Sequence, residues 1–416
     1  MYFKIGLLFV LPLALLPACS QTPALEASAE LTPQFGSSGA DEARALASHD
    51  LGIYVVGSTS GNLHGSHKGG GDAFLRKEDE YGRLLWGVQF GTSSSDGASG
   101  VASDADFNAY VVGVTYGTLT GSRKGESDIF VRKYDPGGGH LWTRQLGTSG
   151  YDSANSVAVD RSGNVYVTAR VGTPVLYKFS ASGSLVWQRP YGSAVSNLSD
   201  VAVDASGNVY LAVSASRDMV LQKLDPAGII LWTRSVDYSS YDSGTAVAVS
   251  GSSVYLVGNY QFADLPEDGN VAITKFTTEG AQLWSNAYGH YGQDAAWDAS
   301  ADRYGDLYIA GYTTTSFAGP NAGNYDGYVF KVSSTGTLTP LWSQAIGTPV
   351  GDYGFAVVAR PVASINCLKR FPSSSCTQVY TAGYSFGSLP FVGNRGQRDA
   401  YLRRLYSDTG GTVWTK

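Results

Sequence analysis

Seven tryptophans recur along this chain in nearly the same local sequence, at intervals of 45 to 72 residues. They are Trp86, Trp142, Trp187, Trp232, Trp284, Trp342 and Trp414. A tyrosine in segments similar to "NVYV" keeps the same pace: Tyr54, Tyr110, Tyr166, Tyr210, Tyr255, Tyr308 and Tyr380. One tyrosine and one tryptophan per unit indicate seven copies of one module. Periods of this length are typical of β-propellers and solenoids.

Each unit is predicted to contain four short strands. The third unit reads "SANSVAVD", "VYVTAR", "VLYKFS" and "LVWQRPYG", separated by tight turns such as "RSGN". Gly and Asn accept the positive φ that such hairpin turns need. Four antiparallel strands make one propeller blade, whereas solenoid coils are usually shorter and more uniform. The sequence therefore predicts an all-β chain that forms a single seven-bladed propeller.

The two ends of the repeat region are predicted to meet. Most tryptophan strands run on into an aromatic or aliphatic residue followed by Gly, as in "QFGT" at residues 89–92, but the last unit stops at "TVWTK". The missing ending is present near the other terminus, in "QFGSSGADEA" at residues 34–43. An N-terminal strand that completes the last blade would close the ring and remove exposed sheet edges.

The N-terminus has the pattern of an export signal. Residues 1–18 carry Lys4 and then a stretch of twelve apolar residues, which is too short to span a bilayer as a helix. "LPAC", ending at Cys19, resembles the bacterial lipobox, so Cys19 is the expected site of lipid attachment; an ordinary signal peptide is the alternative. Residues 19–33 are a Pro/Ala/Ser/Glu tether, and residues 34–416 form the propeller. The resemblance to lipoproteins implies the outer membrane where the cell has one, because Ser20 after Cys19 is no acidic retention signal, and otherwise the outer face of the cytoplasmic membrane.

The net charge and the cysteines indicate which partners and which covalent bond to expect. The formal net charge is −6, and removal of Lys4 with the signal makes it one unit more negative, which disfavours nucleic acid as a partner. We therefore expect the propeller to contact the membrane only through the lipid. The domain is also expected to be a monomer. Cys367 and Cys376 lie in one segment of the last unit, and in an exported protein they are expected to form a local disulfide.

The units resemble the SBBP repeat, a β-propeller repeat of bacterial surface and secreted proteins. The resemblance rests on "SVAVDRSGNVYV", "GGDAFLRKED", "SDIFVRKYD" and "LWTRQLGTSGYDSA", and it covers about residues 34–416. It implies the fold and no common reaction. The turns "DPGGGHLW" and "SDTGGTVW" are also similar to the tryptophan repeats of quinoprotein propellers, which usually have eight blades and often carry a vicinal cysteine pair that is absent here.

Six aspartates precede the first strand of a unit, on the face where the central channel is expected to open. They are Asp41, Asp96, Asp152, Asp242, Asp294 and Asp352. A ring of carboxylates there would suit Ca²⁺, which prefers oxygen ligands. The alternative is that each aspartate caps backbone N–H groups of its own inter-blade loop. No other cofactor is indicated.

Functional asymmetry is expected where the copies differ. The loop between the second and third strands is long in five units and nearly absent in the third and fourth, which predicts a low rim over those two blades. Trp297 stands outside the repeat, and it either stacks against a ligand on the channel face or fills space between blades.

No catalytic motif such as G-x-S-x-G or a P-loop is present. The sequence favours a non-enzymatic, lipid-anchored scaffold for a protein or an envelope polymer. A quinoprotein-like or carbohydrate-active enzyme and a lectin-like glycan binder are the alternatives.

Overall fold

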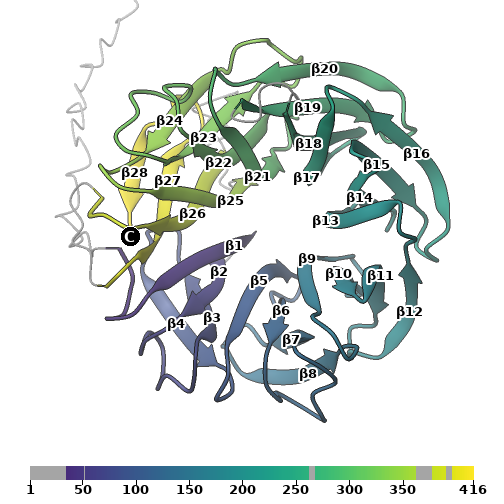
Figure 1. The fold of residues 1–416 in the computed structure, drawn as a ribbon, viewed down its shortest axis with the longest axis vertical. Helices are drawn as coiled ribbons and strands as arrows, with labels where there is room; N and C mark the ends of the chain where they lie inside the picture. Colours follow the sequence, from purple (N-terminus) through teal and green to yellow (C-terminus); the bar gives the residue numbers. More distant parts are fainter. Residues whose placement is uncertain (1–33, 51, 262–267, 362–376, 390–395) are drawn as a thin grey trace, which may run out of the picture.

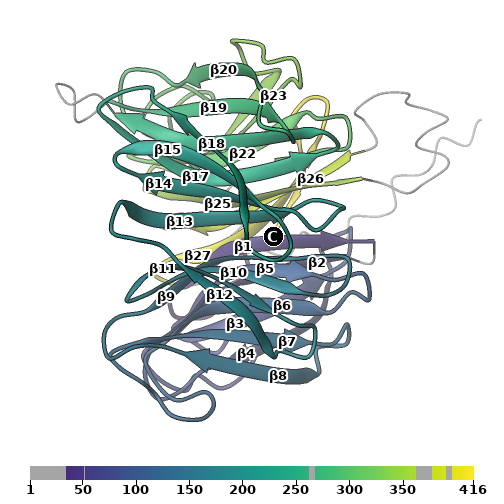
Figure 2. The same cartoon turned by 90° about the vertical axis from the view of Figure 1, so that its right-hand side faces the viewer.

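The chain folds into seven four-stranded antiparallel sheets arranged in a ring (Figure 1), and residues of the innermost strands line a central channel. The structure, a computed structural model, describes residues 34–50, 52–261, 268–361, 377–389 and 396–416. The predicted all-β, seven-bladed fold is confirmed. Strands run across the thickness of the disc, so the loops gather at its two faces (Figure 2). The described part of the chain contains no helix of the length and apolarity that a bilayer crossing needs.

Each blade runs in sequence order from the channel to the rim. The innermost strands are β1 (Asp41–His49), β5 (Asp96–Ser103), β9 (Ser153–Val159), β13 (Val195–Val203), β17 (Tyr241–Ser250), β21 (Asp294–Ala301) and β25 (Asp352–Pro361). The second strands are β2 (Gly52–Thr59), β6 (Ala109–Thr115), β10 (Val165–Val171), β14 (Val209–Ala215), β18 (Ser253–Gln261), β22 (Leu307–Thr313) and β26 (Thr377–Ser385). The third strands are β3 (Asp72–Glu78), β7 (Asp128–Tyr134), β11 (Thr173–Phe179), β15 (Asp218–Leu224), β19 (Gly269–Thr277), β23 (Asp326–Val332) and β27 (Asp399–Tyr406). The outermost strands are β4 (Leu84–Phe90), β8 (His140–Leu146), β12 (Leu185–Pro190), β16 (Ile230–Val236), β20 (Gln282–Tyr288), β24 (Trp342–Ile346) and β28 (Thr412–Thr415).

The marker residues of the repeat lie side by side within each blade. In the first blade Tyr54 pairs with Lys77, which pairs in turn with Trp86, and the other six blades keep this register with a lysine or arginine at the middle position. In six blades the lysine ammonium lies 4.7–5.4 Å from the centre of the tyrosine ring. Such cation–π contacts stabilise a partly desolvated charge.

The same lysine and tryptophan connect each blade to the next. Lys77 and Trp86 both donate hydrogen bonds to the carbonyl oxygen of Pro136, in the turn between the third and fourth strands of the following blade. Six blades repeat this arrangement, with Lys Nζ···O distances of 2.8–3.5 Å and Trp Nε1···O distances of 3.0–3.3 Å. At the seventh junction Arg404 donates to the carbonyl of Glu80 in the first blade, at 3.2 Å.

The two ends of the propeller meet at the last blade. Phe35 forms an isolated antiparallel bridge with Ala400 of β27, and Ala40 forms a parallel bridge with Arg398. β28 pairs with the same strand through Trp414 and Thr415. The described N-terminal residues thus reach the last blade through single bridges, and closure by a whole N-terminal strand stays a prediction.

The two faces of the disc differ in their loops. We call the face where the innermost strands begin the upper face. On this face a loop connects the second strand of each blade to the third. This connection spans residues 60–71 in the first blade and 314–325 in the sixth, but only Gly172 in the third and residues 216–217 in the fourth. The upper rim is therefore built up around some blades and low over the third and fourth, as the sequence predicted.

Candidate functional site

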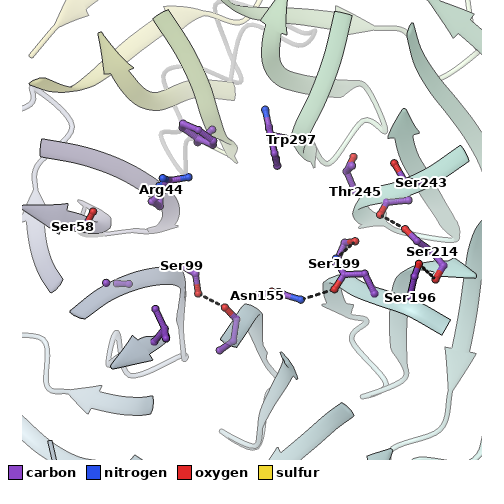
Figure 3. Close-up of a pocket in the computed structure, with 17 residues that line it drawn as sticks. Arg44, Ser58, Ser99, Asn155, Ser196, Ser199, Ser214, Ser243, Thr245 and Trp297 are labelled. Carbon is purple, nitrogen blue, oxygen red and sulfur yellow. Dashed lines mark hydrogen bonds between the residues drawn. The ribbon is translucent and has the colours of Figure 1, made fainter. Parts of the chain in front are cut away.

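Every innermost strand contains a β-bulge near the upper face. At this point the pairing with the second strand skips a residue, and the skipped residue differs from blade to blade. In blade order these residues are Arg44, Ser99, Asn155, Ser199, Thr245, Trp297 and Phe355, and the fourth blade has a second bulge at Ser196. A bulge bends its strand and redirects one side chain. All seven residues line a single cavity of about 730 Å³ at the mouth of the central channel (Figure 3). We call them the bulge ring.

Glycines on the neighbouring strand accompany five of the seven bulges. Five second strands carry Gly close to the bulge: Gly57, Gly113, Gly258, Gly311 and Gly383. A Cβ atom at any of them would overlap a backbone carbonyl oxygen of the innermost strand. The repeated Gly in "YVVG", "YLVG", "YIAG" and "YTAG" therefore permits a close approach of the two strands at five bulges, whereas the third and fourth blades form theirs opposite Ala169 and Val213.

One side of the bulge ring is aromatic and cationic. Trp297 lies 5.5 Å from Phe355, measured between ring centres, and 46% of Trp297 is exposed. The Arg44 guanidinium lies 4.5 Å from the centre of the Phe355 ring and forms an ion pair with Glu42. Figure 3 shows Arg44 and Trp297 projecting toward the same open space. This side offers a flat apolar surface with a positive charge beside it.

The other side of the ring carries small polar groups. Asn155 donates from Nδ2 to Asn197 Oδ1 at 3.0 Å, and Asn197 donates to Ser199 Oγ at 3.0 Å. Ser99 donates to the carbonyl of Ala154 at 2.7 Å. These bonds fix the amides and hydroxyls that face Arg44 and Trp297 across the opening (Figure 3).

Two aspartates lie deeper in the channel, in a second cavity of about 280 Å³ that shares all seven bulge-ring residues with the first. Asp200 accepts hydrogen bonds from Val247 N (2.9 Å) and Ser156 Oγ (2.6 Å), and Asp298 accepts one from Val357 N (2.8 Å). Each carboxyl thereby joins its own innermost strand to a neighbouring one. Burial first, and the Asp200 carboxylate second, raise the pKa of Asp298 to about 7.

The structure does not gather the six predicted cation-site aspartates at a common centre. Asp41, Asp96, Asp152, Asp242, Asp294 and Asp352 each accept a hydrogen bond from the backbone N–H four residues earlier, at 2.5–2.7 Å. Burial raises the pKa of four of them, which are Asp41, Asp96, Asp294 and Asp352. Within the described ranges, no three Asp, Glu, His or Cys side chains are grouped so as to hold a metal ion. These hydrogen bonds match the alternative in which each aspartate caps backbone N–H groups of its own inter-blade loop.

The remaining predicted site residues divide into two groups. Trp297 lines the cavity at the channel mouth, and its contact with a ligand stays a prediction. Cys19, Cys367 and Cys376 lie outside the described residues. Sequence reasoning missed Arg44 and Phe355, because a bulge breaks the alternation by which inward-facing residues are recognised. The glycine repeated on the second strand was the available signal.

Comparisons with known proteins agree with the fold. A model of the SBBP β-propeller repeat matches residues 141–170. An uncharacterized WD repeat-containing protein of Acanthamoeba polyphaga mimivirus is 26% identical over 131 residues, which cover 27% of this chain and 9% of that protein, so the chain matches less than a tenth of this relative. This chain is a β-propeller repeat protein.

Solved structures add the overall shape. A streptogramin B lyase structure superposes with a TM-score of 0.50 at 10% identity, covering 78% of this chain and 90% of that one. The Dos1 propeller gives a TM-score of 0.51 at 10% identity, covering 92% of this chain and 85% of that one. Identities this low show the fold alone.

We predict that Gly311→Ala destabilises the sixth blade, because the new Cβ would overlap the Ala295 carbonyl oxygen and press on the Tyr328 hydroxyl. Overpacking of this kind typically costs about 1–3 kcal/mol, which denaturant unfolding would measure. Gly192→Ala is the control, since a Cβ there meets nothing within 4 Å. Equal stability of the two variants would contradict the steric role given to Gly311.

We predict a pH-dependent contribution from Asp298. Its folded-state pKa of about 7 lies above its ordinary value of 3.8, so the protonated group stabilises the fold at low pH, and this contribution is lost as the pH rises through about 7. Relative to Asp298→Asn, which cannot titrate, the wild type should lose roughly 1.4 kcal/mol per pH unit between about pH 5 and 7. Urea unfolding across this range checks the slope. Asp106→Asn, in an exposed turn, should follow the wild-type profile.

Proposed function

We propose that this protein is a non-enzymatic binding module of the cell envelope, and that the bulge ring binds a glycan-type envelope polymer. The observation that carries the proposal is the composition of the ring. An exposed indole and a stacked Arg–Phe pair face small hydroxyl and amide groups across a cavity of about 730 Å³. That volume falls in the range of about 300–1,000 Å³ that is typical of ligand pockets.

A sugar ring has the two kinds of surface that this site offers to a ligand. Its C–H face stacks on aromatic rings, and its hydroxyl edges exchange hydrogen bonds with Ser, Thr and Asn. Trp297 is suited to the first contact, because the other seven tryptophans pack between blades while Trp297 is 46% exposed. Asn155, Ser199 and Thr245 are suited to the second.

A binding role is supported over catalysis by the groups at the opening. Among the described residues that line the larger cavity there is no Asp, Glu, His or Cys. The carboxyls of Asp200 and Asp298, deeper in the channel, accept hydrogen bonds from backbone N–H groups of adjacent blades. They thereby connect neighbouring strands of the channel wall. A glycan-cleaving enzyme stays the alternative, and product analysis distinguishes it from a binding module.

The location is part of the proposal. Export directed by residues 1–18, a lipid on Cys19 and a tether over residues 19–33 would hold the propeller off the membrane surface. The upper face would then be accessible to polymers of the envelope. The net charge of −6 fits a domain that contacts the membrane only through its lipid.

We predict that Cys19→Ser abolishes lipid attachment. In cells fed radiolabelled palmitate, the wild-type protein should carry label and partition into the detergent phase of Triton X-114, and the variant should do neither. Cys367→Ser is the matched control and should keep its label. Unlabelled wild-type protein would contradict the lipid anchor without bearing on glycan binding.

We predict that Trp297→Ala weakens binding of envelope polysaccharide fragments about two- to tenfold, because one stacking contact of this kind contributes roughly 0.5–1.5 kcal/mol. Isothermal titration of the full-length protein in detergent measures the affinity. Tyr81→Ala is the control, because it removes an exposed ring from the β3–β4 turn on the opposite face. Chromatography of the same samples detects cleavage, and shortened fragments would overturn the non-enzymatic role.

A further inference from the structure

The channel mouth contains two arginines that share one acid. Glu42 of β1 is buried and forms ion pairs with both Arg44 and Arg398, which come from opposite ends of the propeller sequence. The side chains of Arg44 and Arg398 remain 40% and 33% exposed. Glu42 thus forms ion pairs with two guanidinium groups that solvent can reach, and the Asp41 carboxyl also interacts with the charge of Arg398.

Both guanidinium groups lie against aromatic rings. Arg44 lies 4.5 Å from the centre of the Phe355 ring, and Arg398 lies 5.1 Å from that of Tyr384 and 5.9 Å from that of Phe386. Stacking holds a guanidinium flat, so that its N–H edge is oriented before a ligand arrives and less side-chain freedom is lost on binding.

The two arginines line neighbouring parts of one depression. Arg44 lines the main cavity, whereas Arg398 lines a smaller one of about 260 Å³, and the two cavities share Ser58, Gly97 and Val114. Glu42 lines neither of them, and Asp96 is the acidic residue in the smaller one. Asp96 is 3% exposed, and its carboxylate accepts hydrogen bonds from the backbone N–H and the hydroxyl of Thr92 in the same turn.

We propose that the ligand of the bulge ring is an acidic glycan, whose oxyanion groups bind Arg44 and Arg398 while a sugar ring stacks on Trp297. This inference rests on the proposed function and adds the substrate class to it. The planar guanidinium fork binds carboxylate and phosphate oxygens in pairs. The shared chemistry is a sugar that bears an oxyanion, carried either by a uronic acid or by a sugar phosphate.

The test compares three probes by isothermal titration with the full-length protein in detergent. They are a galacturonic acid hexamer, the same hexamer with its carboxyls reduced to alcohols, and a sugar-phosphate polymer of similar length. The wild type should bind at least one acidic probe tenfold or more tightly than the reduced hexamer, and this preference should shrink between about 0.05 and 0.5 M NaCl because salt screens exposed charges. The acidic probe that binds more tightly identifies the source of the oxyanion.

Variants separate the charge from the stacking contact. Arg44→Gln should lower the affinity for the acidic probe about tenfold and that for the reduced hexamer by a clearly smaller factor, because Arg44 also lines the bulge ring. Arg398→Gln, outside the bulge ring, should likewise weaken the acidic probe more than the reduced hexamer. Trp297→Ala should weaken both acidic and reduced probes. Melting temperatures within a few degrees of the wild type show that the variants are folded.

The measurements distinguish a failure of the acidic specificity from a failure of glycan binding. If the wild type binds acidic and reduced hexamers equally, or if Arg44→Gln weakens both by the same factor, the acidic specificity is overturned and glycan binding stands. If the wild type binds none of the three probes, the proposed function is overturned together with this inference.

Discussion

The propeller depends on one backbone carbonyl group per blade junction. In each of six junctions, a lysine ammonium and a tryptophan indole N–H converge on the same carbonyl oxygen of the next blade. Charge-assisted hydrogen bonds are stronger than neutral ones, and here they are half-buried and supported by the tyrosine ring beneath the lysine. The carbonyl lies in a turn whose glycine packs on the tryptophan, as Gly138 packs on Trp86 and Gly228 on Trp187. A side chain at these positive-φ glycines would be strained and would also meet the indole.

This arrangement separates the residues that build the disc from those that give it a function. The Tyr–Lys–Trp row must be repeated, because each junction needs the same donors at the same place. The bulge residue is free of that requirement, since it is skipped by the pairing of its strand and points into the channel. Seven positions can therefore vary independently while the fold stays constant. In this chain they vary to give a stacked arginine, an indole and a phenyl ring opposite four small polar groups.

The fold was predictable because its determinants repeat. Seven tryptophans indicated seven blades, and the short connections of the third and fourth units indicated a low rim, since loop length is read directly from sequence. The binding site was less predictable. Trp297 could be noticed because tryptophan is rare outside the repeat, but Arg44 and Phe355 look like ordinary strand residues until the bulge turns them inward. The aspartates show the opposite case. Their recurrence suggested a shared ring, but each backbone turn bends its carboxylate back toward its own N–H groups, and one-dimensional spacing does not reveal that direction.

The central claim is that the variable bulge residues, and not the repeated framework, contact the ligand. Photocrosslinking with a diazirine-bearing acidic oligosaccharide, followed by peptide mass spectrometry, tests it most directly. The account predicts crosslinks in the innermost-strand peptides that contain Arg44, Trp297 and Phe355, with loss of the crosslinks when unlabelled oligosaccharide competes. Competed crosslinks confined to the outermost strands or to the turns of the lower face would contradict it.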